Sequence, residues 1–111
     1  MAVYSNLYID QGADFSSIVT VEDVLGQLFD LTNYSARGQI RKTYSSSNSI
    51  DFSANIPNPQ SGEILLELTS SQTREMKAGR YVYDVEIFTS NDTEVIRVVE
   101  GQIMVNPEVT R

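Results

Sequence analysis

The sequence predicts an all-β domain, a β-sandwich of about seven strands with one short helix. Three observations support this prediction. Apolar and polar residues alternate with a period of two in successive short segments, turn-forming residues separate these segments, and a single segment begins with a helix-capping pattern. The 111 residues suit one domain that spans 1–111, and a hydrophobic content of 41% is enough for a core.

The first half of the chain contains three clear segments of strand character. Residues 4–10 place Leu7 and Ile9 on one face, and residues 14–21 likewise carry apolar side chains at one parity. Residues 35–42 alternate small or apolar side chains with polar ones. A strand that buries one face has this pattern, so each segment is expected to lie half-buried in a sheet.

Two further strands flank the strongest breaker of the chain. The polar, serine-rich residues 43–49 are expected to form a loop, and residues 50–56 then alternate again. Residues 57–62 contain two prolines and a glycine, which predicts a turn. The next strand is expected over 64–68, where apolar residues again occupy every second position.

A short helix is expected after this strand. Thr69 and Gln72 form a capping-box pattern, a hydroxyl at the N-cap with an amide three residues later. About two helical turns can follow, with Met76 facing the core. Gly79 is placed to end them with a positive φ.

The segment 79–87 is the most informative one. In immunoglobulin-like sandwiches, a tyrosine near the start of strand F lies two residues before the second core cysteine and bonds back to the preceding crossover. Here Tyr83 would occupy the cysteine position, and Tyr81 would make that bond. We therefore predict an immunoglobulin-like sandwich with Gly79, Tyr81 and Tyr83 as a structural corner and the short helix between the E-like and F-like strands. The alternative is that both tyrosines are ordinary large strand residues, and either role is structural.

The last strand is expected over 93–105, and its parity is inconsistent. Ile96 and Val98 agree with each other, whereas Ile103 lies on the opposite phase. One extra residue in a strand reverses which side chains face the core, and glycine tolerates that geometry. We therefore expect a β-bulge at residues 100–101.

Composition excludes several classes of function. The chain has no Cys and no His, which rules out Cys–His and Ser–His–Asp catalysis and nearly rules out zinc hydrolysis. The net charge of −7 argues against sequence-independent nucleic-acid binding and against an anionic membrane surface. We expect no cofactor and no enzymatic activity.

The acidic residues are interpreted mainly as solvated charge. Asp10 and Asp14 flank the first turn, and Asp84 and Glu86 share a strand face, but neither pair predicts a catalytic cleft. The loops contain no calcium-binding pattern of closely spaced Asp and Asn residues, so no metal site is predicted, although calcium binding stays a less favoured alternative.

The basic residues Arg37, Arg41 and Lys42 are interpreted as a solvated face. Arg37 and Arg41 share the outer face of one strand. If that strand lies beside 79–87, these arginines can pair with Asp84 and Glu86. Exposed pairs of this kind contribute only about 0.2–1 kcal/mol each and are more useful for fixing strand register.

Two segments of the chain have distinctive motifs: residues 10–15 read D-Q-G-A-D-F, and residues 29–37 read F-D-L-T-N-Y-S-A-R. They resemble the x-Q-G-x-x-F/W opening and the L-D-L-T-G-Y-x-x-R element of a family of small domains in tailed-bacteriophage virion proteins. Further similarity covers residues 66–69, 79–85 and 100–110, in the right order along almost the whole chain. Asn33 replaces the usual glycine of the second motif, and Asn also tolerates a positive φ.

The resemblance implies an immunoglobulin-like sandwich that attaches proteins to one another inside the virion. Family members are similar to N-terminal attachment domains of baseplate and receptor-binding proteins, or are small stand-alone virion proteins. We therefore expect a non-enzymatic assembly module of the tail, baseplate or neck, made in the host bacterial cytoplasm. Its partners would be other virion proteins, in a homo-oligomer or a symmetric assembly, with no nucleic acid and no membrane.

The alternatives are a head-decoration or fibre module that binds host glycan, and a phage or prophage domain of another, unknown function. A glycan site would need exposed tyrosines such as Tyr4, Tyr8 and Tyr44 beside carboxylates. A small hydrolase is disfavoured by the missing His and Cys. For the attachment module, strand parity gives these candidate contact residues: Arg37, Arg41, Val82, Phe88 and Val99.

Overall fold

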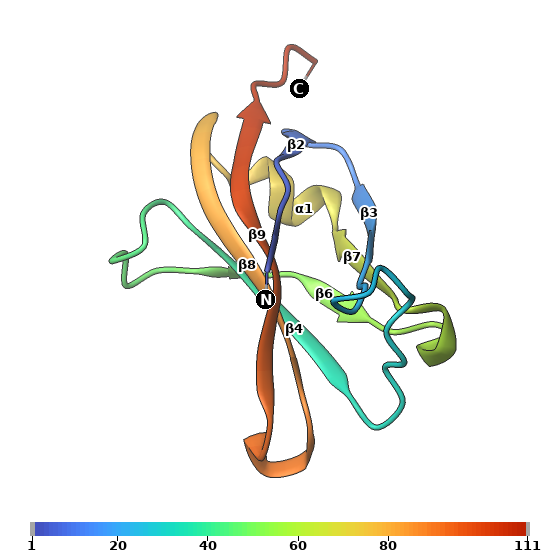
Figure 1. Cartoon of the computed structure of the whole chain (residues 1–111). Coiled ribbons are helices and arrows are strands. Elements are labelled where there is room, and N and C mark those ends of the chain that lie inside the picture. Colours follow the sequence, from blue (N-terminus) through green and yellow to red (C-terminus); the bar gives the residue numbers. More distant parts are fainter. Residues whose placement is uncertain (1, 111) are drawn as a thin grey trace.

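The computed structural model describes residues 2–110, which form two β-sheets and one short helix (Figure 1). The strands are β1 (Val3–Tyr4), β2 (Leu7–Asp10), β3 (Phe15–Thr20), β4 (Ser35–Arg41), β5 (Ile50–Asp51), β6 (Ser53–Asn55), β7 (Glu63–Leu68), β8 (Gly79–Phe88) and β9 (Val95–Asn106). The helix α1 covers Ser70–Arg74, and two 3₁₀ turns cover Pro59–Ser61 and Ser90–Asp92. The predicted all-β class is confirmed.

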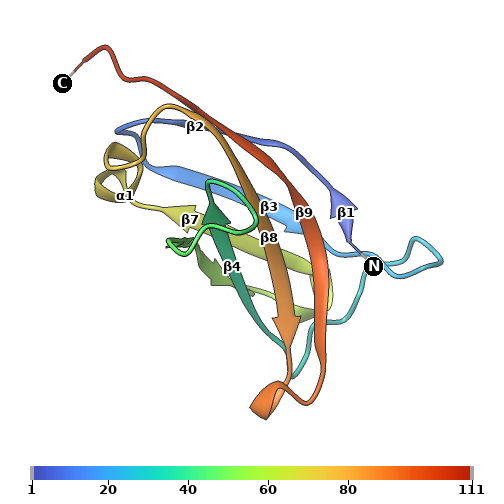
Figure 2. The ribbon, with the colours of Figure 1, turned by 90° about the vertical axis from the view of Figure 1, so that its left-hand side faces the viewer.

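The sheet topology is that of an immunoglobulin-like sandwich. The larger sheet has the order β1-β9-β8-β4-β5, with β2 also paired to β9, and the smaller sheet has the order β3-β7-β6. Both β1 and β2 run parallel to β9, whereas β4, β8 and β9 are antiparallel neighbours. The two sheets face each other across the core (Figure 2).

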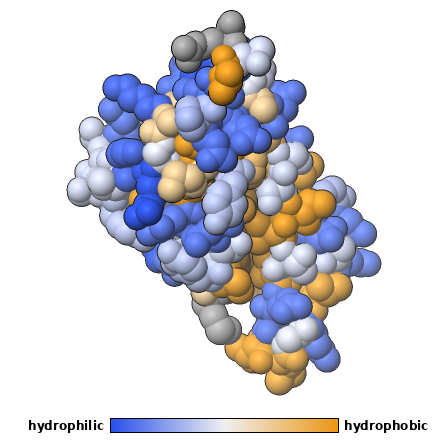
Figure 3. Space-filling view, turned by 90° about the horizontal axis from the view of Figure 1, so that it is seen from above, coloured by the Kyte–Doolittle hydropathy of each residue, from blue (hydrophilic) through white to orange (hydrophobic). Residues whose placement is uncertain are grey.

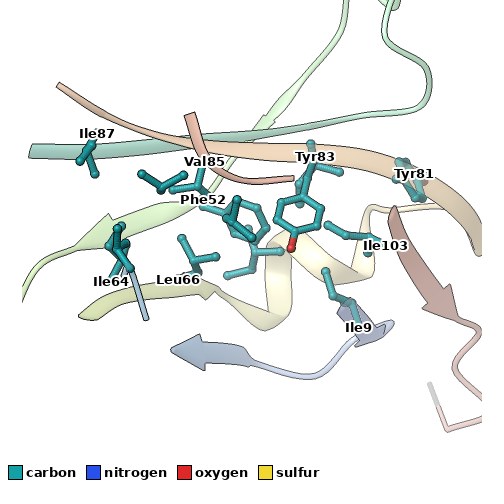
Figure 4. Close-up of a cluster of buried hydrophobic side chains, with 14 of the residues drawn as sticks. Ile9, Phe52, Ile64, Leu66, Tyr81, Tyr83, Val85, Ile87 and Ile103 are labelled. Carbon is teal, nitrogen blue, oxygen red and sulfur yellow. The ribbon is translucent and has the colours of Figure 1, made fainter. Parts of the chain in front are cut away.

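Side chains from both sheets fill the space between them (Figure 4). The inward residues of β8 alternate as the sequence predicts, and Tyr81, Tyr83, Val85 and Ile87 are all buried. Ile64 and Leu66 of β7 meet them from the smaller sheet. Each fully buried aliphatic or aromatic side chain stabilises the fold by about 1.5–3 kcal/mol, so this apolar layer is the main source of stability in a chain without cysteine.

The strand expected over 50–56 is divided between the two sheets. Its first part is β5, which pairs with β4 in the larger sheet, and its second part is β6, which pairs with β7 in the smaller one. Phe52 lies at the crossing, is 6% exposed, and packs its ring edge-on against Tyr83. This one aromatic side chain therefore connects the two sheets at their edge.

The helix begins as predicted and ends earlier than predicted. Thr69 and Gln72 form both hydrogen bonds of the capping box, and Met76 is buried. The helix ends at Arg74, with its C-cap at Glu75. Gly79 does not end it: its φ of +134° belongs instead to the first residue of β8.

The bulge in β9 lies at Val98, not at residues 100–101. Val85 of β8 is opposite Val99, and the next residue of β8 is opposite Arg97, so Val98 is the extra residue. Because the bulge reverses the parity, both Val98 and Val99 are buried, at 5% and 1% exposure. The expectation that Val99 is an outward contact residue is therefore wrong.

Gly101 has a different role, which is to let the N-terminal segment approach β9 closely. A Cβ atom at Gly101 would lie 2.0 Å from the carbonyl oxygen of Ser5, far inside van der Waals contact. The neighbouring amide of Gln102 donates to the side-chain oxygen of Asn6. The connection between β1 and β2, residues 5–6, can therefore lie this close to β9 only because position 101 has no side chain.

Candidate interaction surfaces

The predicted contact residues other than Val99 lie on the outer face of the larger sheet. Arg37 and Arg41 project from β4, and Val82 and Phe88 project from the neighbouring β8. The Arg37 guanidinium lies over the Phe88 ring, 4.3 Å from its centroid. Phe88 is thus a half-buried platform for a cation, and only part of its ring is free for a partner.

The pairing expected for Arg37 is confirmed. Arg37 is opposite Glu86 in the strand register, with 3.0 Å between Nε and Oε1. It also reaches Asp92 in the β8–β9 turn, at 3.4 Å. Arg37 and Asp92 are exposed and Glu86 is half-buried, so these contacts fix register more than they add stability.

The pairing expected for Arg41 is wrong. Arg41 donates to the carbonyl of Ser46 and to the side chain of Gln39. Asp84 instead pairs with Arg97 of β9, at 3.3 Å, a partner that the sequence pattern did not indicate. Arg97 precedes the bulge and has outward parity in either case, and it is the pairing of β9 with β8 that brings it beside Asp84.

Burial raises the pKa of the Asp84 carboxyl above its ordinary value of 3.8. The Arg97 guanidinium lowers this pKa, whereas the carboxylates of Glu86 and Glu100 raise it. Asp84 is thus set among charges of both signs, and a positively charged group of a partner would favour its ionised form.

A broad open depression of about 710 Å³ covers this face. Charged and amide side chains, most of them already paired to one another, line it together with Tyr44 and Val82. Within residues 2–110, no cluster of three potential metal-ligating side chains occurs. The paired charged and amide groups give this face the chemistry of a polar contact surface.

The structural corner makes two hydrogen bonds from tyrosine hydroxyls to the backbone. The Tyr81 hydroxyl donates to the carbonyl of Lys77 at 2.7 Å, which is the bond of a tyrosine corner. The Tyr83 hydroxyl donates to the carbonyl of Ser5 at 2.6 Å. Burial raises the pKa of both phenols, so both remain protonated donors at neutral pH.

Residues 22–28 form an apolar hairpin that was not predicted from the sequence. Val24 and Leu25 are each 79% exposed, and Leu28 is 55% exposed. Figure 3 shows hydrophobic residues gathered at the lower end of that view, and Figure 2 shows this hairpin projecting at the right. Its sequence signal is an apolar pair between Asp23 and Gly26, where a turn normally carries polar residues.

Internal hydrogen bonds hold the 22–28 hairpin in shape. The Asp23 carboxylate accepts from the amides of Leu25 and Gln27, and the Asp23 amide donates to the carbonyl of Gln27. At the base of the hairpin, the Phe29 amide donates to the Val21 carbonyl. The apolar tip is therefore presented on an ordered backbone.

The three tyrosines considered for glycan binding do not form one patch. Tyr4 and Tyr8 lie on β1 and β2 at one edge of the larger sheet. Tyr44 lies in the loop after β4 and lines the charged depression, with β8 and β9 between it and the other two. The structure thus lacks the feature that would favour a glycan site of this composition within its described residues.

No protein-family model matches the chain, and no curated protein matches it. Among the described residues, no helix is long and apolar enough to cross a membrane.

Proposed function

We propose that this protein is a non-enzymatic assembly module that binds other proteins, and more specifically a structural protein of the tail, baseplate or neck of a bacteriophage. The observation that carries the proposal is the exposed apolar tip of the 22–28 hairpin. Leaving Val24 and Leu25 in water has no benefit for the isolated domain, and exposed apolar groups on an ordered backbone are typical of protein contact sites.

Two of the motifs that carry the resemblance to virion proteins, residues 10–15 and 100–110, meet beside the short helix, which supports the proposal. Gln11 of the opening motif donates to the carbonyl of Met76 and accepts from the amide of Glu108, close to the chain's other end. The Thr73 hydroxyl bonds to the adjacent turn as well, accepting from the Gly12 amide. These residues thus form a shared structural junction, which is a physical reason for such motifs to occur together.

The chemistry of the side chains supports a non-enzymatic role. The sequence has neither His nor Cys, and Glu86 and Asp84 on the larger sheet are each paired with an arginine. The Asp84 carboxyl has a raised pKa and lies near the carboxylates of Glu86 and Glu100, but it is paired with Arg97 in an open depression, whereas glycoside hydrolysis uses two carboxylates on opposite sides of a cleft.

The experiment is to follow the chain into particles. In a phage or prophage that encodes it, the epitope-tagged protein should copurify with gradient-purified virions, and deletion of its gene should give particles with incomplete tails. Complementation with Leu25→Asp should leave the folded protein outside the particles, whereas Ile18→Asp, at a 60% exposed position on β3, should be incorporated. Normal, infectious particles that lack the protein would overturn the proposal.

A further inference from the structure

The two ends of the sandwich differ in charge. The antiparallel pairings of β3 with β7, β4 with β8 and β8 with β9 place the connections 21–34, 56–62 and 89–94 at one end, here called the hairpin end. These connections contain no Lys or Arg, and their acidic residues are Glu22, Asp23, Asp30, Asp92 and Glu94. The hairpin end is therefore strongly acidic.

The opposite end, here called the helix end, holds basic residues without acidic partners. It comprises α1, the loop 43–49 and the adjoining strand termini. Four cations gather there and form no ion pair with any acidic side chain in residues 2–110: Arg41, Lys42, Lys77 and Arg80. The same end also carries acidic residues, among them Asp14, which accepts from the amide of Ser70, and Glu75 at the end of α1, so the four cations form a local basic patch in a protein of net charge −7.

The helix end also contains a groove with an apolar floor, here called the basic groove. Ile40, Ile50 and Tyr81 line it together with the loop 43–49, and its volume is about 330 Å³. Arg41 and Lys42 form its rim, with the Lys42 ammonium 4.6 Å from the centroid of the Tyr81 ring. A cavity of about 150 Å³ is enough to hold a benzene molecule, so this groove has room for a pair of aliphatic side chains.

The 22–28 hairpin has the properties that this groove would accept. Its tip presents Val24 and Leu25, and Glu22 and Asp23 flank them with negative charge. The hairpin thus matches the basic groove in both apolar surface and charge sign. Its internal hydrogen bonds reduce the conformational entropy lost on docking.

We infer that the occupant of the basic groove is the 22–28 hairpin of a second copy of this chain, so that molecules associate head to tail. The inference rests on the proposed function and names the partner for it. Figure 2 shows the hairpin at the right and the loop 43–49 on the side facing the viewer, so the two surfaces are separate. A contact between two different surfaces leaves one free hairpin and one free groove, and it therefore repeats into a ring or a filament.

Two other occupants fit the surfaces less well. A two-fold contact between two hairpins would bring Glu22 and Asp23 of both copies together, which is electrostatically unfavourable. A membrane could receive the apolar tip, but the same acidic residues would be repelled by anionic lipids. A second copy satisfies the apolar and the charge requirements at once.

The test measures self-association by sedimentation velocity and light scattering over a range of protein concentrations. The wild-type chain should form oligomers that weaken as salt rises, because screening reduces the attraction between the two ends. Leu25→Asp and Lys42→Glu should each weaken association by roughly 30-fold or more, the loss typical of a central contact residue. Ile18→Asp, an equally charged change on the outer face of β3, should associate as the wild type does.

A mixing experiment tests the head-to-tail geometry. Leu25→Asp has an intact groove and Lys42→Glu has an intact hairpin, so an equimolar mixture should form a heterodimer that grows no further. A mixture that stays monomeric would overturn the head-to-tail geometry, and a wild-type chain that is monomeric at every concentration would overturn the inference. Binding of the monomer to phosphatidylcholine or phosphatidylglycerol vesicles, lost in Leu25→Asp, would overturn it in favour of a membrane.

Both altered side chains are exposed, and unchanged thermal unfolding would show that the variants are folded. The result of the self-association test can be distinguished from the result of the virion experiment that tests the proposed function. A monomeric chain that still enters virions would contradict only the self-association, whereas a chain that oligomerises head to tail but is absent from virions would contradict only the virion role.

Discussion

The hydroxyl of Tyr83 donates a hydrogen bond to the carbonyl oxygen of Ser5, 2.6 Å away and 78 residues apart in the sequence. Tyr83 takes the position that holds a disulfide cysteine in many immunoglobulin-like domains. This chain has no covalent link between the sheets. Instead, the buried Tyr83 phenol binds the connection between β1 and β2 to the centre of the larger sheet.

Tyr83→Phe should lower the free energy of unfolding by about 1 kcal/mol, because it removes a hydrogen bond and keeps the ring in the core. Urea denaturation followed by circular dichroism measures this change. The matched control is Tyr8→Phe. Tyr8 is 70% exposed, so this change should alter the free energy of unfolding by no more than about 0.5 kcal/mol. Equal stabilities of the two variants would contradict a stabilising role for the Tyr83 hydroxyl.

Gly101→Ala should lower stability by about 1–3 kcal/mol, because its methyl group would overlap the Ser5 carbonyl and force β1 away from β9. Hydrogen exchange should show faster exchange of the Ser5 amide, which donates to the Glu100 carbonyl at 2.8 Å. Gly26→Ala is the control: its added methyl meets nothing within 4 Å, and only its φ of +79° is unfavourable. That control should leave the Ser5 amide protected.

Leu31→Ala should cost about 2–5 kcal/mol, because Leu31 is fully buried although it lies in a connection between strands. Leu25→Ala makes the same substitution in the same connection at a 79% exposed position and should change stability by less than about 0.5 kcal/mol. Chemical denaturation of both variants gives the comparison. A large loss for Leu25→Ala would mean that the hairpin tip packs against the domain and is not free for a partner.

Two aspartates should titrate on opposite sides of 3.8 in carboxyl-carbon NMR. Burial raises the pKa of Asp84, whereas the hydrogen bond from the Thr32 side chain lowers the pKa of Asp30. Arg97→Gln should raise the pKa of Asp84 further, since the Arg97 charge lowers it, and should leave Asp30 unchanged. A fall in the pKa of Asp84 in this variant would contradict the pairing.

These two pKa values affect stability in opposite directions. The native state binds a proton on Asp84 more tightly than the unfolded chain does, so the stability that Asp84 contributes is present at low pH and is lost as pH rises through its raised pKa. Asp30 contributes stability above its unfolded pKa, and that contribution is lost as pH falls through its lowered native pKa.

Local patterns in the sequence predict most of this fold because they are set by short-range geometry. The alternation in residues 79–87 and the capping box at Thr69 depend on neighbouring residues alone, and both appear as expected. The bulge is different. Parity indicates that an extra residue exists, but its position at Val98 depends on how β9 pairs with β8.

The contact surfaces are less predictable for a related reason. Parity places Val99 outside, yet the shift at the bulge turns it into the core. Leu25 and Leu31 are the same residue type six positions apart in one connection, and only the packing of the two sheets decides that one is exposed and the other buried. The basic groove joins Ile40, Ile50 and Tyr81 from three separate segments, which no local pattern brings together.

The parallel pairing of β1 and β2 with β9 also determines how the domain responds to mechanical force. Val3 is paired near one end of the sandwich and Asn106 near the other. A pull that separates these two residues slides the strands along each other, so their hydrogen bonds are strained together instead of being opened one after another. The close approach of Ser5 to Gly101 resists the same sliding movement, because the Ser5 carbonyl would have to pass over the neighbouring backbone of β9. The domain is therefore expected to resist stretching along its long axis better than peeling of β1 and β2 from the sheet edge.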